Sequence, residues 1–243
     1  MELLRWLVHK IRRISESIHF CTRKGYNEEL YWENIHHRYN SDFRAVGGGP
    51  SDAHNGRYPQ QKKELLQFLN KLRFNVEKAA CIEFGCGNGY WGRMFLEEGA
   101  QQYVGVDVSK TAIRNCKKSV PTGIFKRLNL GKSDYDLEVQ GDLVFSIDVV
   151  QHFVEEMKLE KLLENMVKAV KPAGLIILTS YTGFGDTYSD SQEEIRLLGF
   201  FKLPKFRYVH FWDIQTVQKH LQHRPLIAME KFWDKTILAF RGS

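Results

Sequence analysis

CIEFGCGNG, the stretch Cys81–Gly89, decides the fold of this chain. The apolar run at 79–84 predicts a buried strand, and glycine then stands at every second position, 85, 87 and 89. Glycine permits positive φ angles and lets the backbone approach a ligand closely. The helix expected at 90–98 begins directly after this loop, and a helix N-terminus favours negatively charged groups. The stretch therefore predicts a strand–loop–helix unit that binds a nucleotide-like ligand.

Outward from this loop, strands and helices are expected to alternate. Apolar periodicity predicts further strands at 103–108, 123–128, 142–147, 175–179, 226–232 and 236–240, with helices at 90–98, 110–118, 154–170 and 213–220. Alternating strands and helices favour parallel pairing with helices on both faces of a sheet. The last two strands are separated by only three residues and form a hairpin. The sequence therefore predicts an α/β fold, a doubly wound Rossmann-like sheet of seven strands with an antiparallel last strand.

The residues before the first strand are expected to form a helical N-terminal cap. This cap covers residues 1–75 and belongs to the same domain as residues 76–243, with helices at 31–39 and 58–72 and a glycine-rich break at Gly47–Asp52. An aromatic-rich insertion at 181–212 follows the fifth strand. It either lines a pocket for an apolar or ring-containing acceptor or packs as a small additional core.

Composition and charge restrict the class of protein. The chain has 243 residues and a formal net charge of +6, and its basic residues are dispersed, which disfavours nucleic acid as a partner. The four cysteines form no CxxC pair, so no metal site is expected, and a reducing cytoplasm is the expected setting. The amphipathic segment Met1–Ile18 either docks on the domain or makes a peripheral membrane contact. Its charged residues interrupt any signal-peptide pattern.

Two acidic residues narrow the ligand of the glycine loop. The loop spacing is G-x-G-x-G, whereas a dinucleotide loop has G-x-G-x-x-G, which argues against a dinucleotide-dependent oxidoreductase. Glu83 at the end of the strand would repel a pyrophosphate and would attract a cationic or amino group. Asp107 ends the next strand about twenty residues further on, where a carboxylate can accept both hydroxyls of a ribose.

With these motifs the sequence resembles the class I S-adenosylmethionine-dependent methyltransferases. It looks most like their small-molecule branch, typified by the ubiquinone-biosynthesis O-methyltransferases. The matching segments are Glu83–Gly89, Gly105–Ser109 and Phe145–Phe153. The resemblance covers residues 55–180 by motif and extends to the C-terminus by strand order.

The resemblance implies contacts to S-adenosyl-L-methionine. The implied cofactor-binding residues are Arg57, Glu83, Gly85, Cys86, Gly87, Asp107, Val108, Asn129, Leu130 and Ile147. In this assignment the glycine loop passes under the methionine part, Asp107 holds the ribose, and Val108 lies against the adenine, which Asn129 and Leu130 flank. Arg57 meets the cofactor carboxylate or is a solvated surface residue. The family often has Asp at the position of Asn129. In this sequence the side-chain amide oxygen of Asn129 would contact the adenine amino group in its place.

His152 is the catalytic candidate, because a neutral imidazole can take the proton of a hydroxyl acceptor as the methyl group arrives. The alternative is a histidine that only packs at a helix start, and His54 and His210 are secondary candidates. The sequence thus predicts a methyltransferase acting on a small molecule, most simply by O-methylation. Methylation of RNA or protein and a non-catalytic cofactor-binding module remain the alternatives.

Overall fold

A seven-stranded sheet forms the centre of the protein. The computed structural model describes residues 27–39, 51–132, 137–181, 195–197, 201–203, 210–221 and 224–241, so the predicted helix Met1–Ile18 and most of the insertion 181–212 lie outside the described residues. The strand order is β3-β2-β1-β4-β5-β9-β8. The bounds are β3 Ile124–Arg127, β2 Gln102–Asp107, β1 Ala80–Phe84, β4 Gly141–Ser146, β5 Val170–Ser180, β9 Lys235–Arg241 and β8 Leu226–Phe232. A separate antiparallel pair joins β6, Ile195–Leu197, to β7, Phe201–Leu203.

The pairing confirms the predicted topology. The strands β3, β2, β1, β4 and β5 pair in parallel, and β9 is antiparallel to both β5 and β8. Only Trp233 and Asp234 connect β8 to β9, and such a short turn joins antiparallel strands. The hairpin folds back so that β9 lies between β5 and β8. This arrangement gives the sheet one reversed strand inside a parallel order.

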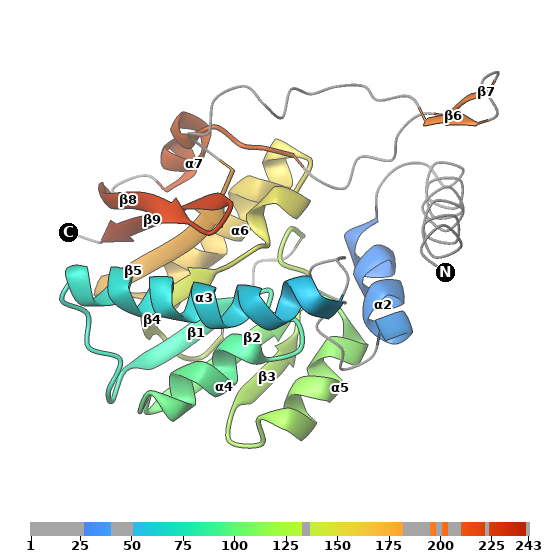
Figure 1. Ribbon diagram of the computed structural model, residues 1–243. Coiled ribbons are helices and arrows are strands. Elements are labelled where there is room, and N and C mark those ends of the chain that lie inside the picture. Colours follow the sequence, from blue (N-terminus) through green and yellow to red (C-terminus); the bar gives the residue numbers. More distant parts are fainter. Residues whose placement is uncertain are drawn as a thin grey trace.

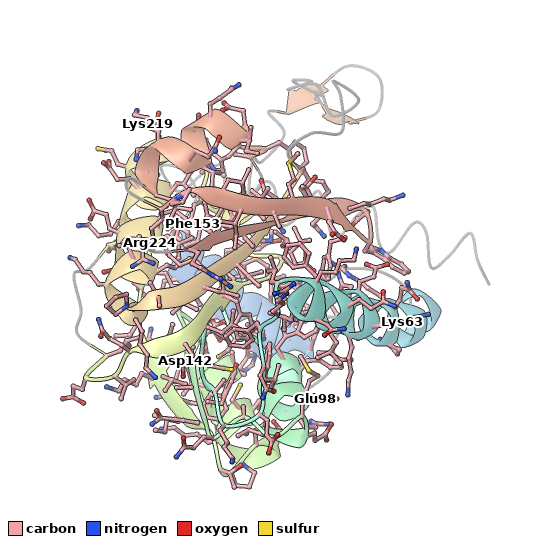
Figure 2. All side chains as sticks on the ribbon, turned by 90° about the vertical axis from the view of Figure 1, so that its left-hand side faces the viewer. Lys63, Glu98, Asp142, Phe153, Lys219 and Arg224 are labelled. Carbon is pink, nitrogen blue, oxygen red and sulfur yellow. The ribbon has the colours of Figure 1, made fainter. Side chains whose placement is uncertain are left out.

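Helices cover both faces of the sheet (Figure 1). One face carries α3 (Ser51–Lys71), α4 (Tyr90–Glu97) and α5 (Lys110–Ser119), and the other carries α6 (Glu156–Ala169) and α7 (Ile214–His220). Neighbouring strand residues alternate between the two layers, as Cys81 packs with the first group and Ile82 with the second. The side view in Figure 2 shows charged side chains such as Lys63, Glu98 and Lys219 around this core.

Two boundaries differ from the sequence prediction. The expected helix 154–170 is α6, Glu156–Ala169, which begins two residues later than predicted, and a 3-10 turn, η2 (Val150–His152), precedes it. The segment Lys171–Gly174, which follows this helix, belongs to β5, where the pairing with β4 is irregular between Gly141 and Leu143. Pro172 lies in this stretch. Proline has no backbone N–H to donate to a sheet, so it is tolerated where the pairing between strands is already interrupted. The helix α3 begins at Ser51, so the expected break does not extend to residues 51 and 52, and Pro59 lies inside the helix.

The described part of the chain also bears on membranes and metals. No helix in it has the length and hydropathy needed to cross a bilayer. Within the same residues no three His, Cys, Asp or Glu side chains are grouped so that they could hold a metal ion.

Candidate functional site

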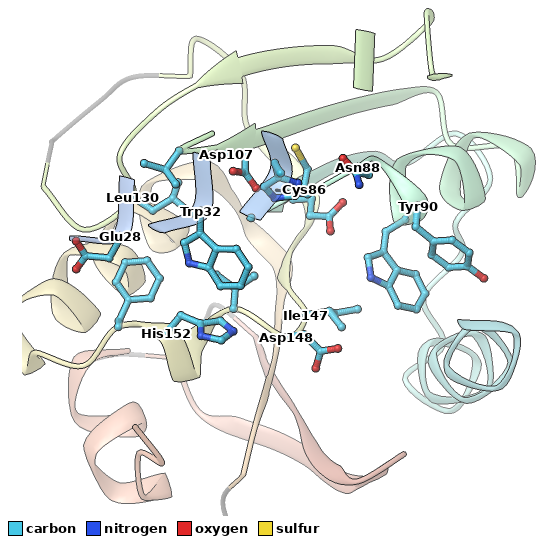
Figure 3. A pocket seen from close by; sticks show the side chains of 18 of the residues that line it. Glu28, Trp32, Cys86, Asn88, Tyr90, Asp107, Leu130, Ile147, Asp148 and His152 are labelled. Atoms are coloured by element: carbon cyan, nitrogen blue, oxygen red, sulfur yellow. Dashed lines mark hydrogen bonds between the residues drawn. The ribbon is translucent and has the colours of Figure 1, made fainter. Parts of the chain in front are cut away.

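A pocket opens at the carboxyl ends of β1, β2 and β4 (Figure 3). The helix α2 (Glu28–Tyr39) contributes to its lining. The space between the pocket walls amounts to about 890 Å³, part of which is open to solvent. Ligands of open α/β sheets bind at this edge. Nine of the predicted cofactor residues and His152 line it: Glu83, Gly85, Cys86, Gly87, Asp107, Val108, Asn129, Leu130, Ile147 and His152. The structure therefore brings together residues from four separate segments of the sequence.

The glycine loop has the backbone that its sequence predicts. Gly85, Gly87 and Gly89 have φ angles of 85°, 51° and 80°. A Cβ on Gly85 would lie 2.4 Å from Cγ2 of Val149. Gly85 is therefore required twice, by its positive φ and by the close approach of the chain segment that follows β4.

Asp107 is fixed by two backbone donors. Its Oδ2 accepts the N–H of Gly87 at 2.9 Å, and its Oδ1 accepts the N–H of Ser109 at 2.9 Å. Ser109 in turn caps α5 by accepting the N–H of Ala112 at 3.1 Å. Each carboxylate oxygen has a second acceptor site. Asp107 thus presents two oriented acceptors to a pocket in which it is 7% exposed.

Glu83 is a buried acid with a raised pKa. It is 1% exposed and accepts a hydrogen bond from the hydroxyl of Tyr103. Burial raises the pKa of Glu83 to about 8, and the nearby charge of Asp107 acts in the same direction. A protonated Glu83 is therefore the stable form of the free site at neutral pH, and a cationic ligand would favour its ionisation.

Cys86 is a packing residue of the loop. Its Sγ lies 4.0 Å from Sγ of Cys116, and the Cys116 thiol donates to the carbonyl oxygen of Gly87 at 3.1 Å. Burial raises the pKa of Cys86 well above its usual value. The Cys86 thiol is accordingly neutral and packs against Cys116, which is hydrogen-bonded to the loop.

Arg57 is placed beside the pocket rather than in its lining. Its guanidinium pairs with Asp148, a pocket residue that also lies 2.6 Å from Nζ of Lys235. Burial opposes ionisation of Asp148, but the charges of Lys235 and Arg57 lower its pKa. Within the described residues the Nε of Arg57 is buried without a hydrogen-bond partner. Arg57 can therefore still donate one N–H to an anionic group.

The helix α2 supplies pocket residues that the sequence analysis did not identify. Glu28, Trp32 and His36 stand four residues apart, so they share one face of the helix, and all three line the pocket. The neighbouring Glu33 accepts hydrogen bonds at 2.7 Å from the hydroxyls of Ser109 and Thr111. Burial acts to raise the pKa of Glu33, but these hydrogen bonds outweigh burial and lower this pKa to about 2. The four-residue spacing of positions 28, 32 and 36 is the sequence signal that could have identified them, because it places them on one helix face.

Two buried nitrogen atoms of pocket residues have no hydrogen-bond partner in the part of the chain that the structure describes. These atoms are His36 Nδ1 and Asn129 Nδ2. Burial lowers the pKa of His36, which keeps its imidazole neutral. Buried polar atoms are normally satisfied, so these two indicate a polar ligand. Together with Asp107, they fit the donor and acceptor groups of a nucleoside.

His152 lies in the turn η2, on the same wall of the pocket as Ile147 and Asp148. Its ring centroid is 4.7 Å from that of Trp32, with the planes at 74° (Figure 3). The backbone N–H of His152 donates to the carbonyl oxygen of Val149 at 2.8 Å, which fixes the turn. The ring centroids of His210 and Trp212 are 4.0 Å apart, and His210 does not line this pocket. The side chain of His54 lies outside the described part of the chain.

The other end of the pocket has an aromatic wall that the sequence analysis also missed. Tyr58 from α3 and Tyr90 and Trp91 from α4 line it, and the rings of Tyr58 and Tyr90 are 4.1 Å apart. Burial raises the pKa of Tyr58, so its phenol stays neutral. The site thus combines polar groups near Asp107 with apolar rings near Tyr90.

Comparisons with known proteins agree with this geometry. Residues 82–176 match the family model described as methyltransferase domain. A tRNA (carboxymethyluridine(34)-5-O)-methyltransferase of Arabidopsis thaliana is 27% identical over 201 residues, 82% of this chain and 43% of that protein. The chain therefore spans less than half the length of this curated relative.

Solved structures share the fold at low identity. An S-adenosylmethionine-dependent methyltransferase from Mesorhizobium loti has a TM-score of 0.57 and 17% identity, covering 72% of this chain and 96% of the other. The magnesium protoporphyrin IX methyltransferase from Synechocystis with bound S-adenosylmethionine has a TM-score of 0.63 and 14% identity, covering 91% and 100%. The resemblance to the ubiquinone-biosynthesis branch stays a prediction. Residues 82–176 of this chain thus match a methyltransferase domain, and the chain has the fold of solved S-adenosylmethionine-dependent methyltransferases.

Proposed function

We propose that this enzyme methylates an oxygen of a small apolar or aromatic acceptor and that His152 is its general base. The observation that supports this proposal most directly is the position of His152. Its side chain lines the same pocket as the glycine loop and Asp107, and Trp32 packs edge-on against its ring. The aromatic wall of Tyr58, Tyr90 and Trp91 is suited to an apolar acceptor.

The cofactor contacts follow from the donors and acceptors of the pocket. Asp107 accepts the ribose hydroxyls through the lone pairs that Gly87 and Ser109 leave unused. Glu83 lies where the cationic amino group of the methionine part would ionise it. Arg57 lies beside the pocket, where its Nη2 holds Asp148, and its Nε–H, which has no partner among the described residues, is the donor that would meet the cofactor carboxylate.

The protein has a limited chemical task. When bound, S-adenosylmethionine supplies an electrophilic methyl group. His152 accepts the proton of the acceptor hydroxyl as the acceptor oxygen bonds to the methyl carbon and the carbon–sulfur bond breaks. The pocket walls align the two reactants and exclude water, which lowers the entropic part of the barrier. A carboxylate acceptor would need no base, because it carries no proton at neutral pH.

The test compares two acceptor types in two variants. His152→Ala should lower kcat for hydroxyl acceptors by about 10²–10⁴-fold, while the Kd of S-adenosylhomocysteine and turnover of carboxylate acceptors change little. His220→Ala is the matched control, since His220 pairs with Glu156 and does not line the pocket. Unchanged turnover of hydroxyl acceptors in His152→Ala contradicts the base role. Cofactor binding without turnover across a broad acceptor panel would instead indicate a non-catalytic module.

RNA is the second candidate acceptor. The curated relative named above is a tRNA methyltransferase whose match covers 82% of this chain, and the net charge of this chain is +6. An RNA acceptor would be bound with an affinity that falls steeply with salt, because contacts to phosphates release counterions. Transfer of a labelled methyl group to total RNA, compared with the small-acceptor panel, distinguishes the two candidates.

A further inference from the structure

One end of the pocket combines a buried acid with an unused amide donor. Glu28 from α2 is 8% exposed and lines the pocket together with Asn129, Leu130 and Phe153. Nζ of Lys158 donates to Oε1 of Glu28 at 2.6 Å in a partly buried ion pair, and the same Nζ lies 2.7 Å from Oε1 of Glu155. Figure 3 shows Glu28 and Leu130 at the end of the pocket opposite Tyr90. A carboxylate thus lines this end of the pocket, and the lysine that pairs with its Oε1 is shared with a second carboxylate.

Lys158 also locates Glu28 relative to the turn after β3. A Cβ on Gly131 would lie 3.1 Å from Cβ of Lys158 and 3.0 Å from Cε1 of Phe153. The turn Asn129–Gly131 therefore packs against the lysine that holds Glu28. Two segments about a hundred residues apart in the sequence meet at one end of the site.

Asn129 is oriented by its own turn. Its Oδ1 accepts the N–H of Gly131 at 3.3 Å, so the amide oxygen is engaged within the turn. Its Nδ2 is buried and has no partner among the residues that the structure describes. The sequence suggested that the oxygen of Asn129 meets the adenine amino group, but the orientation in the structure offers the nitrogen instead. This end of the pocket thus presents one acceptor, on Glu28, and one donor, on Asn129.

We infer that Glu28 and Asn129 together recognise the 6-aminopurine edge of the cofactor. The exocyclic amino group of adenine donates to Oε2 of Glu28, and the ring nitrogen N1 accepts from Nδ2 of Asn129. A 6-oxopurine has the opposite pattern, since its O6 accepts and its N1 donates. It would place an acceptor against the Glu28 carboxylate and a donor against the Asn129 amide. The helix α2 is accordingly part of the cofactor-selectivity apparatus, an inference that rests on the proposed cofactor site.

The test measures the Kd of S-adenosylhomocysteine and of its inosine counterpart on the full chain by titration calorimetry. Wild type should prefer the adenine compound by about 10²-fold or more, because mispaired buried polar groups are costly. Glu28→Gln should lower this preference at least about tenfold, because the glutamine amide can donate to O6. Glu29→Gln is the matched control. It makes the same charge change on the same helix, but its ion pair with Arg127 is exposed and outside the pocket.

A second variant tests the donor. Asn129→Ala should weaken binding of the adenine compound several-fold and leave the inosine compound little changed, which also reduces the preference. Equal weakening of both compounds in Glu28→Gln, or an unchanged ratio, would overturn the inference, since a purely structural role of Glu28 affects both ligands alike. If wild type binds neither compound, the proposed cofactor site itself fails. The two failures are therefore distinguishable.

Discussion

Two carboxyl groups of the pocket, Asp107 and Glu83, are buried within a few ångströms of the same loop but are prepared for different tasks. Asp107 accepts two backbone N–H groups, which fix the direction of its carboxylate. Glu83 has one phenol partner and a pKa raised to about 8 by burial. The first is suited to neutral hydroxyl donors, and the second to a cationic group that ionises it.

The raised pKa of Glu83 predicts proton release on cofactor binding. The free site holds this proton below about pH 8, and a cationic amino group beside Glu83 favours the ionised form. Affinity should therefore rise as the pH rises from 6 towards 8. Calorimetry at pH 6.5 in two buffers of different ionisation enthalpy should detect a released proton for wild type and none for Glu83→Gln. Equal release by both proteins would contradict this role.

Substitution of Asp107 tests the ribose assignment. Asp107→Ala removes both acceptors, and each hydrogen bond to a charged group contributes about 1.5–3 kcal/mol. The Kd of S-adenosylhomocysteine should rise at least about 100-fold by calorimetry. Asp142→Ala is the control, since Asp142 is partly exposed on β4 and holds Ala80 N–H and Lys171 outside the pocket. Near-normal affinity of Asp107→Ala would eliminate the ribose contact.

At the scale of elements, α2 is attached to three neighbours by acidic residues. Glu28 pairs with Lys158 of α6, Glu29 pairs with Arg127 of β3, and Glu33 accepts from the first turn of α5. These contacts hold the face that carries Trp32 and His36 against the pocket. Cofactor binding and the docking of α2 should therefore be coupled.

The N-cap of α5 provides a test of this coupling. Ser109→Ala removes the cap and a hydrogen bond to Glu33, so unfolding in urea should show a loss of about 1–2 kcal/mol. Because Glu33 and Asp107 both meet this turn, the affinity for S-adenosylhomocysteine should fall as well. Asp213→Ala removes the comparable cap of α7, which does not touch the pocket, and should lower stability alone. The same loss of affinity in both variants would argue against coupling through α5.

At the scale of the whole molecule, one ionic cluster joins three distant segments. Asp148 after β4 pairs with Arg57 of α3 and with Lys235 at the start of β9, whose side chain is 2% exposed. The backbone N–H of Asp148 also donates to Thr179 Oγ1 of β5 at 2.9 Å. The cluster fixes the reversed strand and the helix α3 at the mouth of the pocket.

Loss of the central charge should be costly. Asp148→Asn leaves two buried cations without their shared anion, and breaking a buried pair typically costs about 3–5 kcal/mol. The matched control is Glu230→Gln, which breaks the exposed pair with Lys71 and should cost less than about 1 kcal/mol. Urea unfolding at pH 7 measures both variants, and equal small losses would contradict a structural role for the cluster.

Acid should remove the same contribution. The pKa of Asp148 is lowered in the folded protein, so its contribution is fully present above the unfolded value of 3.8 and is lost as the pH falls below it. The stability difference between wild type and Asp148→Asn should therefore be constant from pH 7 to 5 and should shrink below about pH 4. A difference that shrinks between pH 7 and 5 would assign the effect to another group.

The sequence by itself determined the sheet, its reversed strand and the cofactor loop. Strand and helix periodicity, the cap at Ser109 and the short turn after Phe232 are local properties, and they fix the topology once connections are right-handed. The glycine loop and Asp107 were equally readable, because a positive φ and a strand-end carboxylate are recognisable from residue type and spacing.

Only the tertiary structure decided which side chains beyond the glycine loop line the pocket. Glu28 meets Lys158 across 130 positions, and Glu33 meets Ser109 across 76, and no local pattern encodes such contacts. The direction of the Asn129 amide likewise depends on the turn that folds around it. The loop Cys81–Gly89 thus sets where the pocket forms, whereas packing of α2 on the finished domain sets which further side chains line it.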